Sequence, residues 1–144
     1  RAGEQELKGV YDRVNPERAG ALRAAKSEEM LIALLVRHPD LWEKLRAALP
    51  PEEWITSFNR RVYEFLLKEF AGAPDTAAPV FAGAFDEKEQ ARISFMINAP
   101  VLHGDPWGQM ADCIQIIKSE GAKKIDPGAL SAEEIMRRLQ TKGD

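Results

Sequence analysis

Apolar residues recur at helical spacing through most of the sequence, and no stretch shows the strict alternation of a half-buried strand. The clearest helix is predicted to run from Ser27, as its N-cap, to about Arg37. Residues 30–36 are all apolar, so this helix should be buried on nearly all sides. His38-Pro39 ends it, because proline lacks the backbone donor that a helix interior needs.

Proline, glycine and capping residues divide the rest of the chain into further short helices. The expected segments are residues 39–49, 51–54, 57–70, 86–99 and 105–121, with an ambiguous loop at 76–85. An amphipathic helix is predicted at 7–14, and a weaker second segment opens at Pro16 with Ala19 and Leu22 as its apolar residues. Asp86 and Glu89 have the spacing of a capping box, and Asp105 precedes a proline at the first helical position. Gly121 is the expected end of the helix at 105–121, and Asn15 is a candidate cap near the start of the chain.

A final short helix is predicted over residues 132–142, beyond a Pro-Gly turn. Ser131 and Glu134 have the spacing of a capping box at its start. A helix of this length is marginal alone in water, so it must dock on the main body or on a partner.

These elements predict an all-α fold, a compact multi-helix bundle with a short C-terminal helical appendage. The expected parts are an N-terminal linker or helix at 1–26, the bundle at 27–120 and the appendage at 121–144. Because residue 1 is arginine, we expect the chain to be a fragment of a longer protein.

Composition excludes several classes of protein. The 144 residues are 44% hydrophobic and 30% charged, which is typical of a globular protein, and the longest apolar run is too short to span a bilayer. A net charge of −3 argues against strong direct binding to nucleic acid, which needs a basic face. Cys113 is the only cysteine, which excludes an internal disulfide and favours a reducing bacterial cytoplasm.

Groups that could carry chemistry are few and scattered. His38, His103 and Cys113 lie far apart in sequence, and no phosphate-binding loop or nucleophile elbow is present. Paired glutamates, such as Glu28-Glu29, fall near predicted helix starts, where capping and the helix dipole explain them better than acid–base catalysis does. We therefore expect no catalytic residue, metal or cofactor in this chain.

Two features favour a role in binding. Arg60-Arg61 could contact an acidic partner or a phosphate backbone, although a solvated helix face is the simpler interpretation. The final helix could enter a groove of a partner with its apolar residues, while its arginines line the rim; packing on its own bundle is the alternative. The candidate partner-binding residues are Ile135, Met136, Arg137, Arg138, Leu139, Arg60 and Arg61.

Two runs of sequence resemble the C-terminal domain of DnaG-type bacterial DNA primases. They are L-R-A-A-K-S-E-E-M-L-I-A-L-L-V-R-H-P-D-L-W at residues 22–42 and P-P-E-E-W-I-T-S-F-N-R-R-V-Y-E-F-L at residues 50–66. The shared order is a buried helix ending at Pro-Asp, a second helix, a short acidic-aromatic turn and a helix opening with Phe-Asn-Arg-Arg. The run D-C-I-Q-I-I-K at residues 112–118 is similar to the family's long connecting helix.

The resemblance implies a non-catalytic domain that docks on the replicative DnaB-type helicase in the primosome and couples RNA priming to unwinding. In that family a terminal helical appendage is commonly the main anchor, and some members also contact single-strand DNA-binding protein. The parent primase, a nucleotidyltransferase, is expected to use zinc and magnesium in preceding domains whose motifs are absent here. The family often ends in a long helical hairpin, whereas only one short helix is predicted at 132–142.

Two other interpretations stay open. The N-terminal domain of the helicase itself shares the helical bundle, but it begins differently from the Leu22–Ala25 run and is normally followed by a linker and an ATPase domain. A small helical nucleic-acid-binding module would use basic residues, and the acidic net charge counts against it. The basic residues concerned are Arg60, Arg61, Lys118, Lys123 and Lys124.

Overall fold

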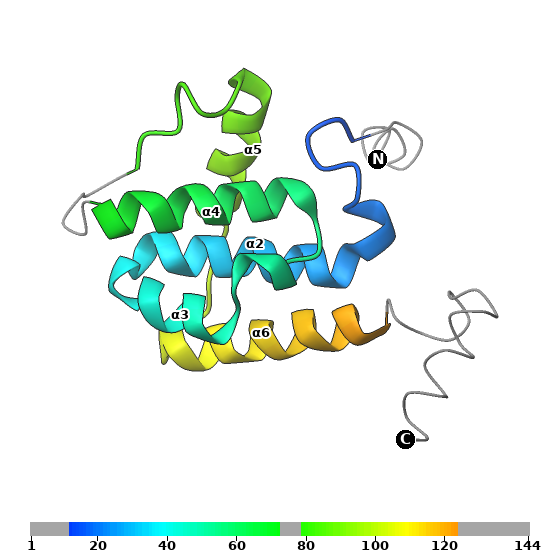
Figure 1. Cartoon of the computed structure of the whole chain (residues 1–144), viewed down its shortest axis with the longest axis vertical. Helices are drawn as coiled ribbons and strands as arrows, with labels where there is room; N and C mark the ends of the chain where they lie inside the picture. The colour runs from blue at the N-terminus through cyan, green and yellow to red at the C-terminus, as the bar shows by residue number, and fades with distance from the viewer. Residues whose placement is uncertain (1–11, 73–78, 124–144) are drawn as a thin grey trace, which may run out of the picture.

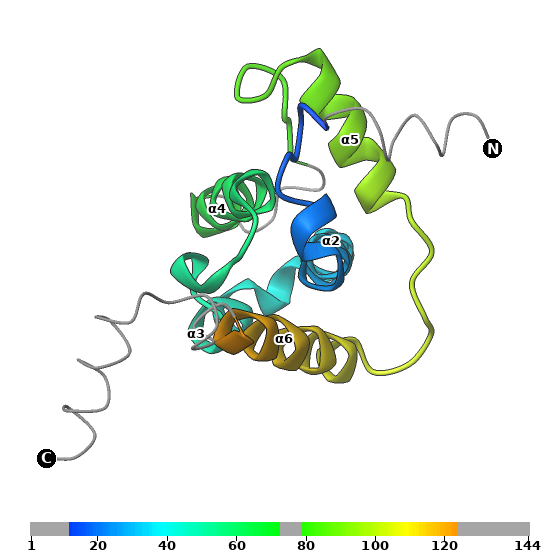
Figure 2. The ribbon, with the colours of Figure 1, turned by 90° about the vertical axis from the view of Figure 1, so that its right-hand side faces the viewer.

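The computed structural model of the chain describes residues 12–72 and 79–123. Its central element is helix α2 (Leu22–Arg37), and α4, α5 and α6 each pack against it (Figures 1 and 2). The other α-helices are α3 (Trp42–Ala48), α4 (Ser57–Gly72), α5 (Glu87–Ile97) and α6 (Pro106–Lys123). The described residues contain no strand beyond an isolated bridge between Ala82 and Phe85, so the predicted all-α bundle is confirmed.

Helix α2 is buried as expected but begins earlier than the sequence pattern predicted. It starts at Leu22, so Ser27 is a buried residue inside the helix and the prediction that it is the N-cap was wrong. Ala24 and Ala25 explain the extension, because alanine has the highest helix propensity and both side chains are fully buried. The helix therefore begins within the segment 1–26 that was expected to be a linker or helix.

The proline breaks lie where they were predicted. Short 3-10 helices occupy Pro39–Leu41 and Pro51–Glu53, at the starts of the second and third predicted segments. Proline fixes its own φ near the helical value and needs no donor at a helix start, which is why these turns open at proline. Residues 79–85 form the loop that was expected between α4 and α5, and it packs Phe81 and Phe85 near Phe65 of α4.

The predicted caps of α5 and α6 are present. In α5 the Asp86 side chain accepts from the Glu89 N–H at 2.8 Å, and the Glu89 side chain accepts from the Asp86 N–H at 2.9 Å. At α6 the Asp105 carboxylate accepts from the Gly108 N–H at 3.1 Å. The prediction that α6 ends at Gly121 was wrong: the helix continues to Lys123, because Gly121 does not adopt the left-handed conformation that ends helices.

The core is formed by side chains from all five described helices, with α2 at its centre. Leu31, Ile32 and Leu35 of α2 are completely buried. Trp54 stacks on Tyr63 with ring centroids 4.2 Å apart, and the Tyr63 hydroxyl donates to the Leu49 carbonyl at 2.9 Å. The turn before α4 is thereby joined to the interior of the bundle.

The predictions for the two ends of the chain fall largely outside the described residues. The predicted final helix at 132–142 lies entirely outside them, and so does most of the predicted helix at 7–14. Within the described part, residues 12–15 are not helical, and Asn15 does not cap a helix as predicted. Its side chain instead donates to the Thr56 hydroxyl at 3.2 Å, 41 positions further along the chain.

Candidate docking surface

The sequence-predicted binding residues fall into two groups. Ile135, Met136, Arg137, Arg138 and Leu139 lie outside the described residues, as does Lys124. Arg60 and Arg61 lie in the first turn of α4. The structure therefore bears directly only on the arginine pair.

Arg60 and Arg61 point to different neighbours. Arg60 Nη2 donates to the Trp54 carbonyl at 2.7 Å, so it ties the turn before α4 to that helix. Arg61 Nη1 lies 2.9 Å from Glu89 Oε2, and its guanidinium lies over the Phe85 ring at 5.0 Å. The hydrogen bond from Arg61 lowers the pKa of Glu89. The two arginines hold local structure and do not present one shared basic patch.

The other described basic residues of the nucleic-acid interpretation also have acidic neighbours. Lys118 lies 3.5 Å from Glu53, and Lys123 lies 3.0 Å from Glu120. Exposed ion pairs of this kind contribute little to stability. They do balance the positive charge locally, which leaves no uncompensated cationic stripe among these residues for a phosphate backbone.

A large apolar side chain is exposed on α5. Phe95 is 76% exposed, and it borders two hollows of the surface. One hollow is lined by Ala91, Ser94, Phe95, Asn98, Ala99 and Pro100. An aromatic side chain beside shallow hollows is typical of a protein-binding surface, because aromatic residues supply much of the binding energy when a partner covers them.

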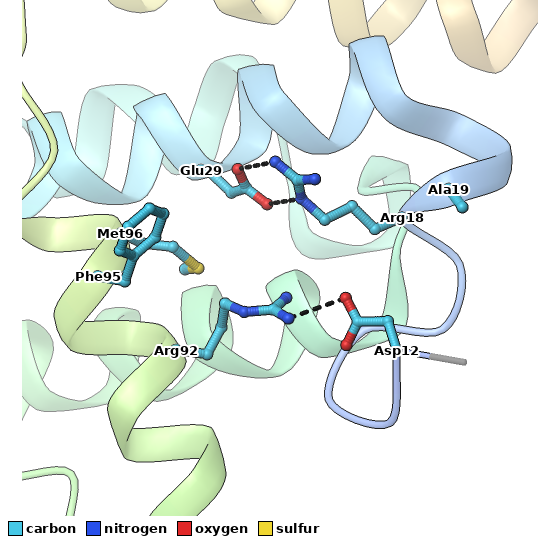
Figure 3. Close-up of a pocket in the computed structure, with 7 residues that line it drawn as sticks. All are labelled: Asp12, Arg18, Ala19, Glu29, Arg92, Phe95 and Met96. Carbon is cyan, nitrogen blue, oxygen red and sulfur yellow. Dashed lines mark hydrogen bonds and ion pairs between the residues drawn. The ribbon is translucent and has the colours of Figure 1, made fainter. Parts of the chain in front are cut away.

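The second hollow is a pocket of about 240 Å³ between the N-terminal segment, α2 and α5 (Figure 3). Its lining residues are Asp12, Arg18, Ala19, Glu29, Arg92, Phe95 and Met96. Arg18 holds Glu29 through two hydrogen bonds, of 2.7 and 3.1 Å, and Arg92 lies 2.8 Å from Asp12. Two facing ion pairs thus line a pocket whose remaining wall is apolar.

A buried carboxylate joins α2 to the start of α4. Glu28 of α2 is completely buried, and its oxygens accept from the backbone N–H groups of Ile55 and Thr56, from the Thr56 hydroxyl at 2.7 Å and from Asn59 Nδ2 at 3.1 Å. Burial raises the pKa of Glu28, although these hydrogen bonds oppose the shift. The prediction that Glu28 serves its own helix start was wrong, because the side chain satisfies donors at the start of α4 instead.

The candidate metal ligands are not brought together. Among the residues that the structure describes, no group of three or more His, Cys, Asp or Glu side chains could hold a metal ion. Burial raises the pKa of the Cys113 thiol to about 11, so this thiol stays protonated at neutral pH. Over the described ranges 12–72 and 79–123, no helix combines the length and apolar character needed to cross a membrane.

Phe95, Arg92 and Glu28 are the notable residues that the sequence interpretation missed. Phe95 is exposed on α5, whereas Ile93 and Met96 of the same helix are buried, and an aromatic residue outside the apolar stripe of its helix was a usable signal. Arg92 and Glu28 had no such signal in the sequence, since the side chains or backbone groups that they contact lie far along the chain.

No family model, curated protein or solved structure matches the chain. The arrangement of its residues offers exposed apolar surface and locally balanced charge, which suits contact with another protein.

Proposed function

We propose that this chain is a protein-docking domain, the C-terminal part of a DnaG-type bacterial primase, which binds a replicative DnaB-type helicase and couples priming to unwinding. In this proposal the chain itself is non-catalytic. Contact with single-strand DNA-binding protein is a further property that the sequence resemblance suggests.

The order of the helices is the observation that supports this proposal most. Helix α2 ends at Arg37, two residues before Pro39-Asp40, and α3 follows. A 3-10 turn at Pro51–Glu53 precedes Trp54, and α4 opens with Ser57-Phe58-Asn59. The resemblance implies this same succession of a buried helix, a second helix, an acidic-aromatic turn and a helix that opens with Phe-Asn-Arg-Arg. The sequence motifs and the observed elements thus coincide along residues 22–66.

In this proposal the helicase is bound mainly through the residues after α6. In the same proposal, Ile135, Met136 and Leu139 enter a groove of the helicase, and Arg137 and Arg138 form the rim of the contact. Phe95 is the large exposed aromatic of the described surface, so it is the residue at which a second contact is tested.

Fluorescence anisotropy of the labelled full chain, titrated with the helicase of the same organism, tests the proposal. We expect saturable binding at micromolar concentration or tighter. Ile135→Asp combined with Leu139→Asp should weaken it by about tenfold or more, because two anchors of an interface each contribute on the order of 1–2 kcal/mol. Binding equal to that of the unchanged chain would exclude the final segment as the anchor.

A matched pair of variants tests the surface of α5. Phe95 is 76% exposed and Leu102 is 77% exposed, so Phe95→Ser and Leu102→Ser remove comparable exposed apolar groups without disturbing the core. Weaker binding by Phe95→Ser alone would locate a second contact on α5. If the full chain instead binds DNA strongly and with steep salt dependence but does not bind helicase, the nucleic-acid module is the better description.

A further inference from the structure

Two hollows of the surface lie along the C-terminal half of α6. The larger, of about 540 Å³, lies between α6 and the neighbouring turn before α4 (Figure 1), and its lining includes Trp54, Ile55 and Ile117. The smaller, of about 190 Å³, shares Ile55 with it and reaches the start of α2. We call the two hollows the α6 groove. It extends to Lys123, so it adjoins the point at which residues 124–144 follow α6.

Gly121 lines the groove at a position where α6 itself has no need of glycine. The helix continues past it to Lys123, and its φ is not positive. Glycine inside a helix costs roughly 1 kcal/mol relative to alanine. An added Cβ would lie more than 4 Å from every neighbouring atom outside its own stretch of helix. Gly121 therefore leaves open space in the groove, which lets another segment approach the α6 backbone closely.

The chain that follows α6 is long enough to return over this groove. The predicted helix at 132–142 would be about 16 Å long at 1.5 Å per residue. Residues 124–131 precede it, and a stretch of this length spans up to about 28 Å when extended. Asp126-Pro127-Gly128 is a turn signal, so a reversal of the chain is expected there. The predicted helix can therefore lie antiparallel to the last turns of α6.

The side chains of the predicted final helix form an apolar face with a basic flank. Ile135, Met136 and Leu139 share one face by the helical period. Arg138 and Lys142 are four positions apart, so they lie together beside that face. A groove that suits this helix needs apolar walls and an acidic edge.

The α6 groove has both features. Glu52 and Glu53 line the larger hollow, and both are exposed. Glu53 lies 3.5 Å from Lys118, which is an exposed pair of little strength. Glu52 forms no ion pair with the residues that the structure describes. Two adjacent carboxylates thus lie at the edge of a hollow whose walls include Trp54 and Ile55.

We propose that residues 132–142 dock in the α6 groove of their own chain, with their apolar face inward and their basic flank beside Glu52 and Glu53. Docking buries a helix that is too short to be stable alone in water. The same apolar face is the proposed helicase anchor, so the docked chain binds helicase weakly until helicase displaces the segment. This regulatory consequence rests on the proposed function, whereas the docking itself does not.

Amide hydrogen exchange of the full chain, measured without helicase, tests the docking. We expect residues 133–140 to exchange at least about tenfold more slowly than an unstructured peptide. Gly121→Leu places a side chain in the groove at a position where a Cβ meets no other part of the bundle, so it should abolish this protection. Glu52→Lys combined with Glu53→Lys should reduce the protection several-fold, because the basic flank then meets like charge.

The matched control is Gly72→Leu at the end of α4, where an added Cβ is equally free and the groove is not involved. It should leave the exchange of residues 133–140 unchanged. Exchange of these residues at the rate of an unstructured peptide in the unchanged chain would overturn the docking. So would protection that survives Gly121→Leu, or protection that Gly72→Leu removes equally.

The regulatory consequence is measured separately, by titration with the helicase. Gly121→Leu should bind the helicase several-fold more tightly than the unchanged chain, because the anchor no longer has to leave the groove. Equal affinities would contradict this regulation. A helicase that binds neither chain would contradict the proposed function, and the exchange result, obtained without helicase, would still decide the docking.

Discussion

Glu28 shows how a single buried side chain organises two helices. It lies in the middle of α2, yet its oxygens satisfy N–H groups of Ile55 and Thr56 just before α4. A charged group is costly to bury unless its oxygens are hydrogen-bonded, and here both oxygens accept. Glu28 thus joins the residues just before α4 to the interior of α2, while the Ser57 N–H at the start of α4 donates to Glu17.

Glu28→Ala should destabilise the protein by about 3 kcal/mol, because buried donors of Ile55, Thr56 and Asn59 lose their acceptor. Urea unfolding followed by circular dichroism measures this change. Glu64→Gln, which removes an exposed carboxylate from α4, is the control for net charge and should change the unfolding free energy by only about 0.5 kcal/mol or less. A loss for Glu28→Ala as small as that of the control would contradict this structural role of Glu28.

The pH dependence of stability gives a second test of Glu28. Burial raises its folded pKa above the ordinary value of 4.5, so the folded state holds this proton more tightly than the unfolded state does. The stabilisation that comes from this tighter proton binding is therefore fully present below pH 4.5. It is lost as the pH rises through the folded pKa of Glu28. The unfolding free energy of the unchanged chain relative to Glu28→Gln should fall as the pH rises above 4.5 and through the raised folded pKa. A rise over that range would contradict the raised pKa.

The sequence was least informative about which partners individual side chains contact. The pair Glu28-Glu29 was interpreted as serving a nearby helix start, but Glu28 serves α4 and Glu29 binds Arg18. Neither partner lies within one helical turn, so no spacing rule connects them. Phe95 differs, because an aromatic residue outside the apolar stripe of its helix was visible in the sequence.

At the scale of elements, proline residues were strong local signals for the starts of helices. Prolines at 39, 51 and 106 mark helix starts, since the ring fixes φ and removes a donor that those positions do not need. The start of α2 was missed because Ser27, a good cap by residue type, is buried inside the helix. The helix propensity of Ala24 and Ala25, together with their complete burial, extends the helix to Leu22.

The capping box of α5 yields a prediction at this scale. Asp86→Ala should lower the unfolding free energy by about 1 kcal/mol, because the Glu89 N–H loses its acceptor, whereas Asp86→Ser keeps an acceptor and should cost only a few tenths. Thermal and urea unfolding of the two variants measure the difference. Equal losses for Ala and Ser would show that the Asp86 side chain does not stabilise α5 as a cap.

For the whole molecule, the sequence predicted the all-α bundle because the buried helix and its proline-ended neighbours determine most of the packing. It did not predict the contacts that residues 12–18 make with α2, α4 and α5, which link positions up to 80 residues apart. The final segment was therefore identified as a candidate docking element from its sequence pattern. Phe95 and its neighbouring pocket were identified from the fold.

The proposed function requires that this chain acts on a replicative helicase. Unwinding of a forked DNA by the purified DnaB-type helicase, measured with increasing amounts of the full chain, tests that claim most directly. We predict that the unwinding rate rises and saturates at the chain concentration that saturates binding. An unchanged rate across that range, with no complex formed at micromolar concentration, would contradict the account.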